Sequence, residues 1–275
     1  DNPHLNIEHT PEEKCFPFTE KHQERTQQLL SIWQEITTTY SNARARVYTT
    51  PDSSQNSVAA ALSHHDWNEI AHPLDLRLYL FNTARLGENL PWGLPPLETL
   101  QITASLAHLV DRQETSIKGK VNIVNLCKTA TVGMNYIRSA TPEIHLRQEN
   151  TMMNKIVKNA NYDEIMASLV TIINNSANFN AQALDITLRT GRGKTIIVLT
   201  DDAGGVKDFG MLCQDQHADR PTLFQKGKSG RESTGLGLYG VWELVKGMNG
   251  IVTARNTTHS NGKPGLELQI MLDTA

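Results

Sequence analysis

The stretch that decides the fold is Leu223-Phe-Gln-Lys-Gly-Lys-Ser-Gly-Arg-Glu-Ser-Thr-Gly-Leu-Gly-Leu-Tyr-Gly240. A basic, glycine-rich loop leads through Gly235-Leu236-Gly237-Leu238 into a segment whose apolar residues have helical spacing, namely Val241, Leu244, Val245 and Met248. Glycines before a helix let backbone N–H groups reach a ligand, and the helix N-terminus adds a partial positive charge. The stretch therefore suits a phosphate chain, although a simple tight turn gives the same pattern.

Composition sets the limits within which this stretch is interpreted. The 275 residues suggest about two domains, and 26 basic against 29 acidic residues indicate no nucleic-acid partner. The cysteines Cys15, Cys127 and Cys213 are scattered without metal-ligand spacing, which favours a reduced, cytoplasmic compartment. No apolar run approaches the length of a membrane helix within these residues. Because the chain starts at Asp1 without Met, we expect an excerpt of a longer protein, with a membrane anchor elsewhere left open.

The N-terminal half has helical periodicity. Residues 1–56 form an N-terminal segment that contains a predicted signalling helix from about Glu20 to Val47. Residues 57–117 form a predicted helical hairpin, which is broken by the prolines of Leu90-Pro-Trp-Gly-Leu-Pro-Pro96. One hairpin buries little by itself, so we expect it to pair with a second copy into a four-helix bundle.

The C-terminal half, residues 118–275, alternates between strand and helix patterns. A predicted helix over Asp163–Phe179 precedes a hairpin signal around Gly191-Arg-Gly193. The expected fold class is therefore α+β, in which a helical hairpin precedes an α/β sandwich with helices on one face of the sheet. The expected strands are Glu143–Arg147, Ala183–Thr190, Lys194–Thr200, Ile251–Asn256 and Gly265–Leu272.

Three features of this half carry candidate chemistry. Asn174, Asn175 and Asn178 lie in a predicted helix, where asparagine is unfavourable but its amide oxygen can bind Mg²⁺. The strand ending in Thr200-Asp-Asp-Ala-Gly-Gly-Val206 presents an aspartate that can accept a hydrogen bond from a purine amine. Lys226, Lys228 and Ser229 can close over a polyphosphate. Each feature also has an ordinary alternative, namely an exposed face, a turn or a solvated charge run.

In this order, the asparagine helix, strand–Asp–Gly turn, Phe-x-x-Gly-x-Ser loop and Gly-x-Gly helix start resemble the ATP-binding domain of the GHKL superfamily. The resemblance covers about residues 118–275. Within the superfamily, this part of the chain is most similar to sensor histidine kinases, because the domain is compact and a helical hairpin precedes it. It implies ATP and Mg²⁺ as cofactors, with Asn175 as the Mg²⁺ ligand and Asp201 at the adenine amine. The other implied binding residues are Asn178, Gly205, the lid residues Phe224, Lys226, Lys228 and Ser229, and Gly235, Leu236, Gly237 and Leu238 at the phosphates.

The sequence departs from the family pattern at two places. Ala203 stands where the family usually has glycine, and Ser233 replaces a glycine ahead of Thr234. These departures imply weakened nucleotide binding.

The phospho-acceptor is expected on the first hairpin helix. His65-Asp66-Trp67-Asn68-Glu69 is similar to the His-Asp-Phe-Asn-Asn box of one group of these kinases, so His65 would be the nucleophile and Asp66 the general base. In a competing alignment, Pro73-Leu74 matches the commoner box, which puts Asn68 at the acceptor position and leaves no acceptor. Glu69 departs from the Asn or Thr usual in the family, which favours kinase over phosphatase activity.

The resemblance implies a homodimeric protein-histidine kinase that phosphorylates itself on His65 from ATP. It would pass the phosphoryl group to an aspartate of a response-regulator receiver. The first alternative is a histidine phosphotransferase or pseudokinase that docks response regulators but uses ATP poorly. The second is a GHKL ATPase that works by conformational change, although the transducer region of such enzymes is missing.

Overall fold

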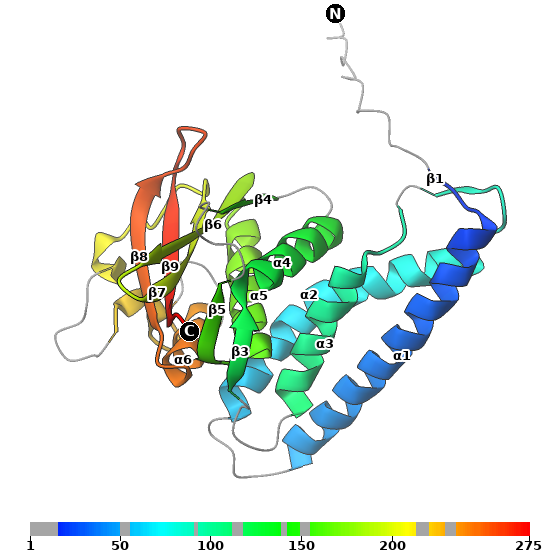
Figure 1. Ribbon diagram of the computed structural model, residues 1–275, viewed down its shortest axis with the longest axis horizontal. Helices are drawn as coiled ribbons and strands as arrows, with labels where there is room; N and C mark the ends of the chain where they lie inside the picture. The colour runs from blue at the N-terminus through cyan, green and yellow to red at the C-terminus, as the bar shows by residue number, and fades with distance from the viewer. Residues whose placement is uncertain are drawn as a thin grey trace, which may run out of the picture.

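The computed structural model describes residues 16–49, 56–90, 93–111, 118–138, 142–148, 155–212, 220–228 and 235–275. In this part of the chain a group of three helices lies beside an α/β layer (Figure 1). The helical group contains α1 (Glu20–Thr49), α2 (Asn56–Thr83) and α3 (Leu97–Asp111). A short bridge between β1 (Phe16–Pro17) and β2 (Asn89–Leu90) ties the start of α1 to the segment after α2.

Helix α1 is amphipathic and supplies the apolar face that the hairpin needs. Its buried residues recur every three or four positions and pack against α2 and α3. Trp67 of α2 stacks between two aromatic rings of α1, with centroids 3.8 Å from Tyr40 and 5.9 Å from Trp33. Trp33 also donates a hydrogen bond from Nε1 to Asp75, at 2.9 Å. The buried stripe of α1 consists of Thr26, Leu29, Trp33, Ile36, Tyr40 and Ala43.

Helix α3 is packed on two sides by helices of its own chain. It packs against α1 and α2 on one side and against α4 (Ile123–Arg138) and α5 (Tyr162–Asn178) on the other. The sequence analysis missed this role of α1, because periodicity shows that a helix is amphipathic but not which partner it covers. Pairing of the hairpin with a second copy stays a prediction.

The α/β layer confirms the predicted fold class. A five-stranded sheet runs in the order β4-β6-β7-β9-β8, with β4 and β6 parallel and the other pairs antiparallel. Helices α4, α5 and α6 (Gly237–Gly247) cover the sheet, with α5 between the other two. The strands are β4 (Glu143–Gln148), β6 (Ala183–Gly191), β7 (Lys194–Asp201), β8 (Ile251–Thr258) and β9 (Pro264–Asp273).

A smaller antiparallel pair, β3 (Gly119–Asn122) and β5 (Ile156–Ala160), flanks this sheet. Two short 3-10 helices, η2 (Phe209–Leu212) and η3 (Thr222–Phe224), follow β7. The buried apolar residues form one continuous core from α1 to β8. The helical group and the α/β layer are therefore packed together directly, with α3 and α2 against α5.

Candidate functional site

The carboxylate of Asp201, at the end of β7, is buried and held from two sides. Its Oδ1 accepts the backbone N–H groups of Ala203, at 3.1 Å, and Leu266, at 3.0 Å. Its Oδ2 accepts the hydroxyl of Ser176 on α5, at 2.9 Å. The proposed adenine-binding aspartate therefore has a fixed orientation, set by its own turn, by β9 and by α5.

The turn after Asp201 accommodates Ala203 at the position where the family usually has glycine. Its left-handed backbone conformations fall on Gly204 (φ 94°) and Gly205 (φ 71°), where glycine is unstrained. Asn256 of β8 holds the turn by two hydrogen bonds to Val206. Its Oδ1 accepts the N–H of Val206 at 2.7 Å, and its Nδ2 donates to the C=O of Val206 at 2.8 Å. A Cβ at Gly205 would lie only 2.7 Å from Oδ1 of Asn256, so this position requires glycine.

The start of α6 lies directly against the asparagine helix. A Cβ at Gly237 would lie 3.2 Å from Nδ2 of Asn175, 3.5 Å from its Oδ1 and 3.3 Å from Cγ2 of Thr171. The absence of a side chain at Gly237 therefore lets the start of α6 pack closely against the Asn175 amide. This donor set fits the implied cofactors, because a neutral amide oxygen stands at a helix N-terminus that favours phosphate.

The loop between β7 and α6 is anchored at both ends. Phe224 is fully buried and packs on Trp242 of α6, with ring centroids 5.3 Å apart. Gly235 (φ 61°) accepts the N–H of Gly227 at 3.3 Å, which brings the two ends of the proposed lid together. Phe224 is thus an anchor of the lid rather than part of an open surface.

The remaining predicted nucleotide residues are placed as follows. Lys226 and Lys228 are exposed, and Asn178 is exposed at the last residue of α5. Leu236 precedes α6 as its N-cap residue, and Leu238 is half-buried against the core. Ser229, Ser233 and Thr234 lie outside the described residues.

The predicted phospho-acceptor segment lies on α2 and contacts α5. The side chains of His64 and His65 lie outside the described residues, whereas Asp66 is buried. Oδ2 of Asp66 accepts the hydroxyl of Thr171 at 2.6 Å, and Oδ1 accepts the side-chain amide of Asn174 at 2.9 Å. The residue next to His65 is therefore bonded to the same turn of α5 that carries Asn175.

A second set of bonds strengthens this contact between α2 and α5. The guanidinium of Arg138, at the end of α4, bonds both Glu69 of α2 and Asn174 of α5. Glu69 thus has a structural partner in this conformation. Asn68, the acceptor position of the competing alignment, and His72 are both exposed.

The turn between β8 and β9 supports the site through Asp202, which the sequence did not predict. Burial alone would raise the pKa of Asp202. The hydrogen bonds from the N–H groups of Ala183 and Gln182, the amide of Asn261 and the ammonium of Lys263 outweigh it, so the pKa is about 2. Asn261 and Lys263 belong to the turn between β8 and β9. Their bonds to Asp202 therefore tie this turn to the end of β7, next to Asp201.

Close approach of β9 to β7 also escaped the sequence analysis. A Cβ on Gly265 would collide with the backbone carbonyl of Asp201. Gly265 is therefore required where β9 passes the end of β7. The signal in the sequence was a glycine at the start of a strand pattern, since a glycine in a strand often marks close backbone approach.

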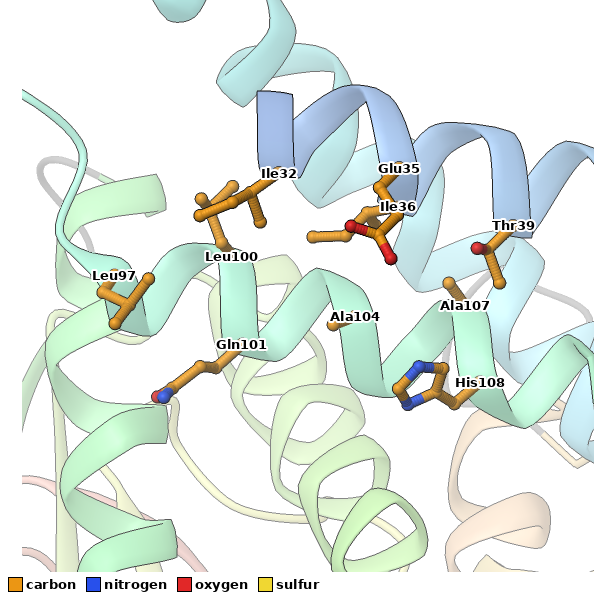
Figure 2. Close-up of a pocket in the computed structure, with 10 residues that line it drawn as sticks. All are labelled: Ile32, Glu35, Ile36, Thr39, Leu97, Leu100, Gln101, Ala104, Ala107 and His108. Atoms are coloured by element: carbon orange, nitrogen blue, oxygen red, sulfur yellow. The ribbon is translucent and has the colours of Figure 1, made fainter. Parts of the chain in front are cut away.

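A separate hollow of about 240 Å³ lies in the helical group, between α1 and α3 (Figure 2). Its walls are largely apolar, and none of the predicted nucleotide or acceptor residues lines it. The lining residues are Ile32, Glu35, Ile36, Thr39, Leu97, Leu100, Gln101, Ala104, Ala107 and His108. This hollow lies between packed helices, and its lining residues are separate from the nucleotide motifs and from the acceptor segment.

Within the described ranges of the chain, no cluster of three or more His, Cys, Asp or Glu side chains has the arrangement of a metal site. No helix in those ranges combines the length and hydropathy needed to span a bilayer.

Similarity to known proteins is found among solved structures. No family model matches the chain, and no curated protein matches it. The solved structures that match include the mycobacterial sensor histidine kinase MprB, at 15% identity and a TM-score of 0.46, over 57% of this chain and 98% of that one. The histidine kinase AdeS of Acinetobacter baumannii matches at 15% identity and a TM-score of 0.42, over 76% and 97% of the two chains.

The histidine kinase domain of the E. coli osmosensor EnvZ also matches, at 21% identity and a TM-score of 0.39, over 59% of this chain and 91% of that one. These three proteins are named as histidine kinases. At such identities and TM-scores the similarity decides no function.

Proposed function

We propose that this chain is an ATP-dependent protein-histidine kinase that phosphorylates itself on His65. One observation supports the proposal most strongly. The hydroxyl of Thr171 bonds Asp66, next to His65, while its methyl carbon faces Gly237 at the start of α6. The acceptor segment and the phosphate-binding helix start are therefore separated by a single side chain.

Different residues of the α/β layer bind the different parts of the nucleotide. Asp201 accepts a hydrogen bond from the adenine amine, and the N-terminus of α6 faces the phosphates, where its partial positive charge stabilises them. Lys226 and Lys228, both exposed on the lid, offset further phosphate charge. Asn175 would hold Mg²⁺, whose positive charge would offset the charge of the phosphates.

In the reaction, a ring nitrogen of His65 attacks the terminal phosphorus of ATP. The new P–N bond replaces the P–O bond to ADP, which leaves, and the ring proton passes to a base. Asp66 is the proposed base, held in place by Thr171 and Asn174. The phosphoryl group then moves to an aspartate carboxylate of a response-regulator receiver, where a P–O bond replaces the P–N bond.

The proposed partners are that receiver and a second copy of the chain, which pairs through the α2–α3 hairpin. Leu76 and Tyr79 of α2 are 54% and 63% exposed, and such pairing would cover them. Light scattering of the purified chain, compared with a variant carrying Leu76→Glu and Tyr79→Glu, tests the second copy. The pairing requires a dimer for the unmodified chain and a monomer for the variant.

The activity is tested by incubating the chain with γ-labelled ATP and Mg²⁺ and treating the product with acid and with base. A phosphohistidine gives label that is lost in acid and retained in base. The proposal requires that His65→Ala removes the label while His64→Ala and His72→Ala retain it. Absence of label together with measurable receiver docking would instead support a phosphotransferase.

A further inference from the structure

The hydrogen bonds around Asp201 leave very little of its carboxylate available. A carboxylate offers about four lone-pair positions on its two oxygens. The N–H groups of Ala203 and Leu266 occupy Oδ1, and the hydroxyl of Ser176 occupies one position of Oδ2. One acceptor position on Oδ2 therefore remains for a ligand.

Ser176 itself becomes an acceptor by making this bond. A hydroxyl has one proton to donate, and the proton of Ser176 goes to Asp201, at 2.9 Å. Ser176 is 4% exposed and neighbours Asn175 on α5, so its position is fixed by the helix. The remaining lone pairs of its Oγ lie beside the open position of the carboxylate.

We propose, building on the proposed function, that Ser176 is a positioning residue that gives the site its preference for a 6-amino over a 6-oxo purine. The Ser176–Asp201 pair presents acceptors and no donor. The amino group of adenine satisfies such a pair, whereas the carbonyl oxygen of guanine places a third acceptor against it. Without the Ser176 hydroxyl, Oδ2 regains a second open position, and a water molecule that can donate to a carbonyl enters there.

The test compares the dissociation constants of ATP and GTP, measured by calorimetry with Mg²⁺, for the unmodified chain and two variants. The first variant is Ser176→Ala. The matched control is Ser168→Ala, which removes an equally buried hydroxyl from the same helix, one that bonds only the backbone carbonyl of Glu164 at 2.8 Å. Both substitutions remove one buried hydrogen bond, so a purely structural effect changes both variants alike.

We expect the unmodified chain and Ser168→Ala to prefer ATP over GTP by about a hundredfold. Ser176→Ala reduces this ratio by about tenfold, mainly through weaker ATP binding. If ATP binds the unmodified chain and both variants keep the same ratio, the role of Ser176 is overturned while the proposed function stands. If neither nucleotide binds the unmodified chain, the proposed function and this inference are overturned together.

Discussion

The hydroxyl of Thr171 on α5 lies 2.6 Å from Oδ2 of Asp66 on α2. This bond joins the helical group to the α/β layer at the point where the proposed acceptor segment meets the proposed phosphate site. Thr171 also faces the start of α6 through its methyl group. Thr171 therefore couples the two halves of the chain.

Thr171→Val keeps the shape of the side chain but removes the donor to Asp66. We expect the free energy of unfolding to fall by about 2 kcal/mol, because hydrogen bonds to charged groups contribute more than neutral ones. Thr103→Val is the matched control, since Thr103 is buried on α3 and bonds only backbone carbonyls of its own helix. Urea denaturation measures both, and equal losses would contradict a special role for the Asp66 bond.

Gly265→Ala places a methyl group where β9 passes the carbonyl of Asp201. The strand must shift, so we expect a loss of about 3 kcal/mol in stability, at the upper end of overpacking effects. A Cβ at Gly247, at the end of α6, meets no atom within 4 Å, so Gly247→Ala should leave stability unchanged or slightly raised. Thermal unfolding of the two variants checks this contrast, and similar melting temperatures would refute the close approach.

Asp202 makes stability depend on pH in the acid range. Its pKa in the folded chain, about 2, lies below the ordinary value of 3.8, so its contribution is complete above 3.8 and is lost as pH falls toward 2. We expect Asp202→Asn to cost roughly 2 kcal/mol at neutral pH and progressively less below about pH 4.

The control for this prediction is Asp273→Asn, because Asp273 is exposed in its pair with Lys194 and surface pairs contribute little. Urea denaturation across the acid range should show a pH-dependent difference for Asp202→Asn alone. If the difference in the free energy of unfolding between the unmodified chain and Asp202→Asn stays constant down to pH 2, the ionised form of Asp202 does not stabilise the fold.

Tyr40 connects α1 to the acceptor helix by stacking on Trp67, with ring planes at 2°. Tyr40→Ala removes this stacking and leaves a cavity, so we expect a loss of about 3 kcal/mol and a shifted tryptophan fluorescence. Asn42→Ala, at an exposed position of the same helix, should change neither. Unaltered fluorescence in Tyr40→Ala would mean that Trp67 has no such contact in solution.

Local patterns were sufficient to predict most of the elements. The helical spacing of the α1 stripe and the turn at Gly191-Arg-Gly193 both predicted what the structure shows. The helix α2 lies almost entirely within the predicted hairpin and continues through Pro73. Strand β5 was missed, because its five residues, Ile156–Ala160, show no clear alternation.

The contacts that complete the candidate site could not be predicted in this way. Ser176 is adjacent to a recognised motif residue, but only the packing of α5 on the end of β7 reveals its bond to Asp201. Asn256 and Gly265 act on a turn far away in sequence, through the register of the β-sheet. Such roles depend on tertiary distances, which the spacing of residues along one element does not contain.

The most direct measurement for the whole account is the calorimetric titration of ATP with Mg²⁺ into the unmodified chain and into Asp201→Asn. Asp208→Asn, an exposed substitution on the following loop, serves as the control. We expect one ATP per chain for the unmodified protein and the control, and a loss of about a hundredfold in affinity for Asp201→Asn. Absence of ATP binding to the unmodified chain, or equal affinity in Asp201→Asn, would contradict it.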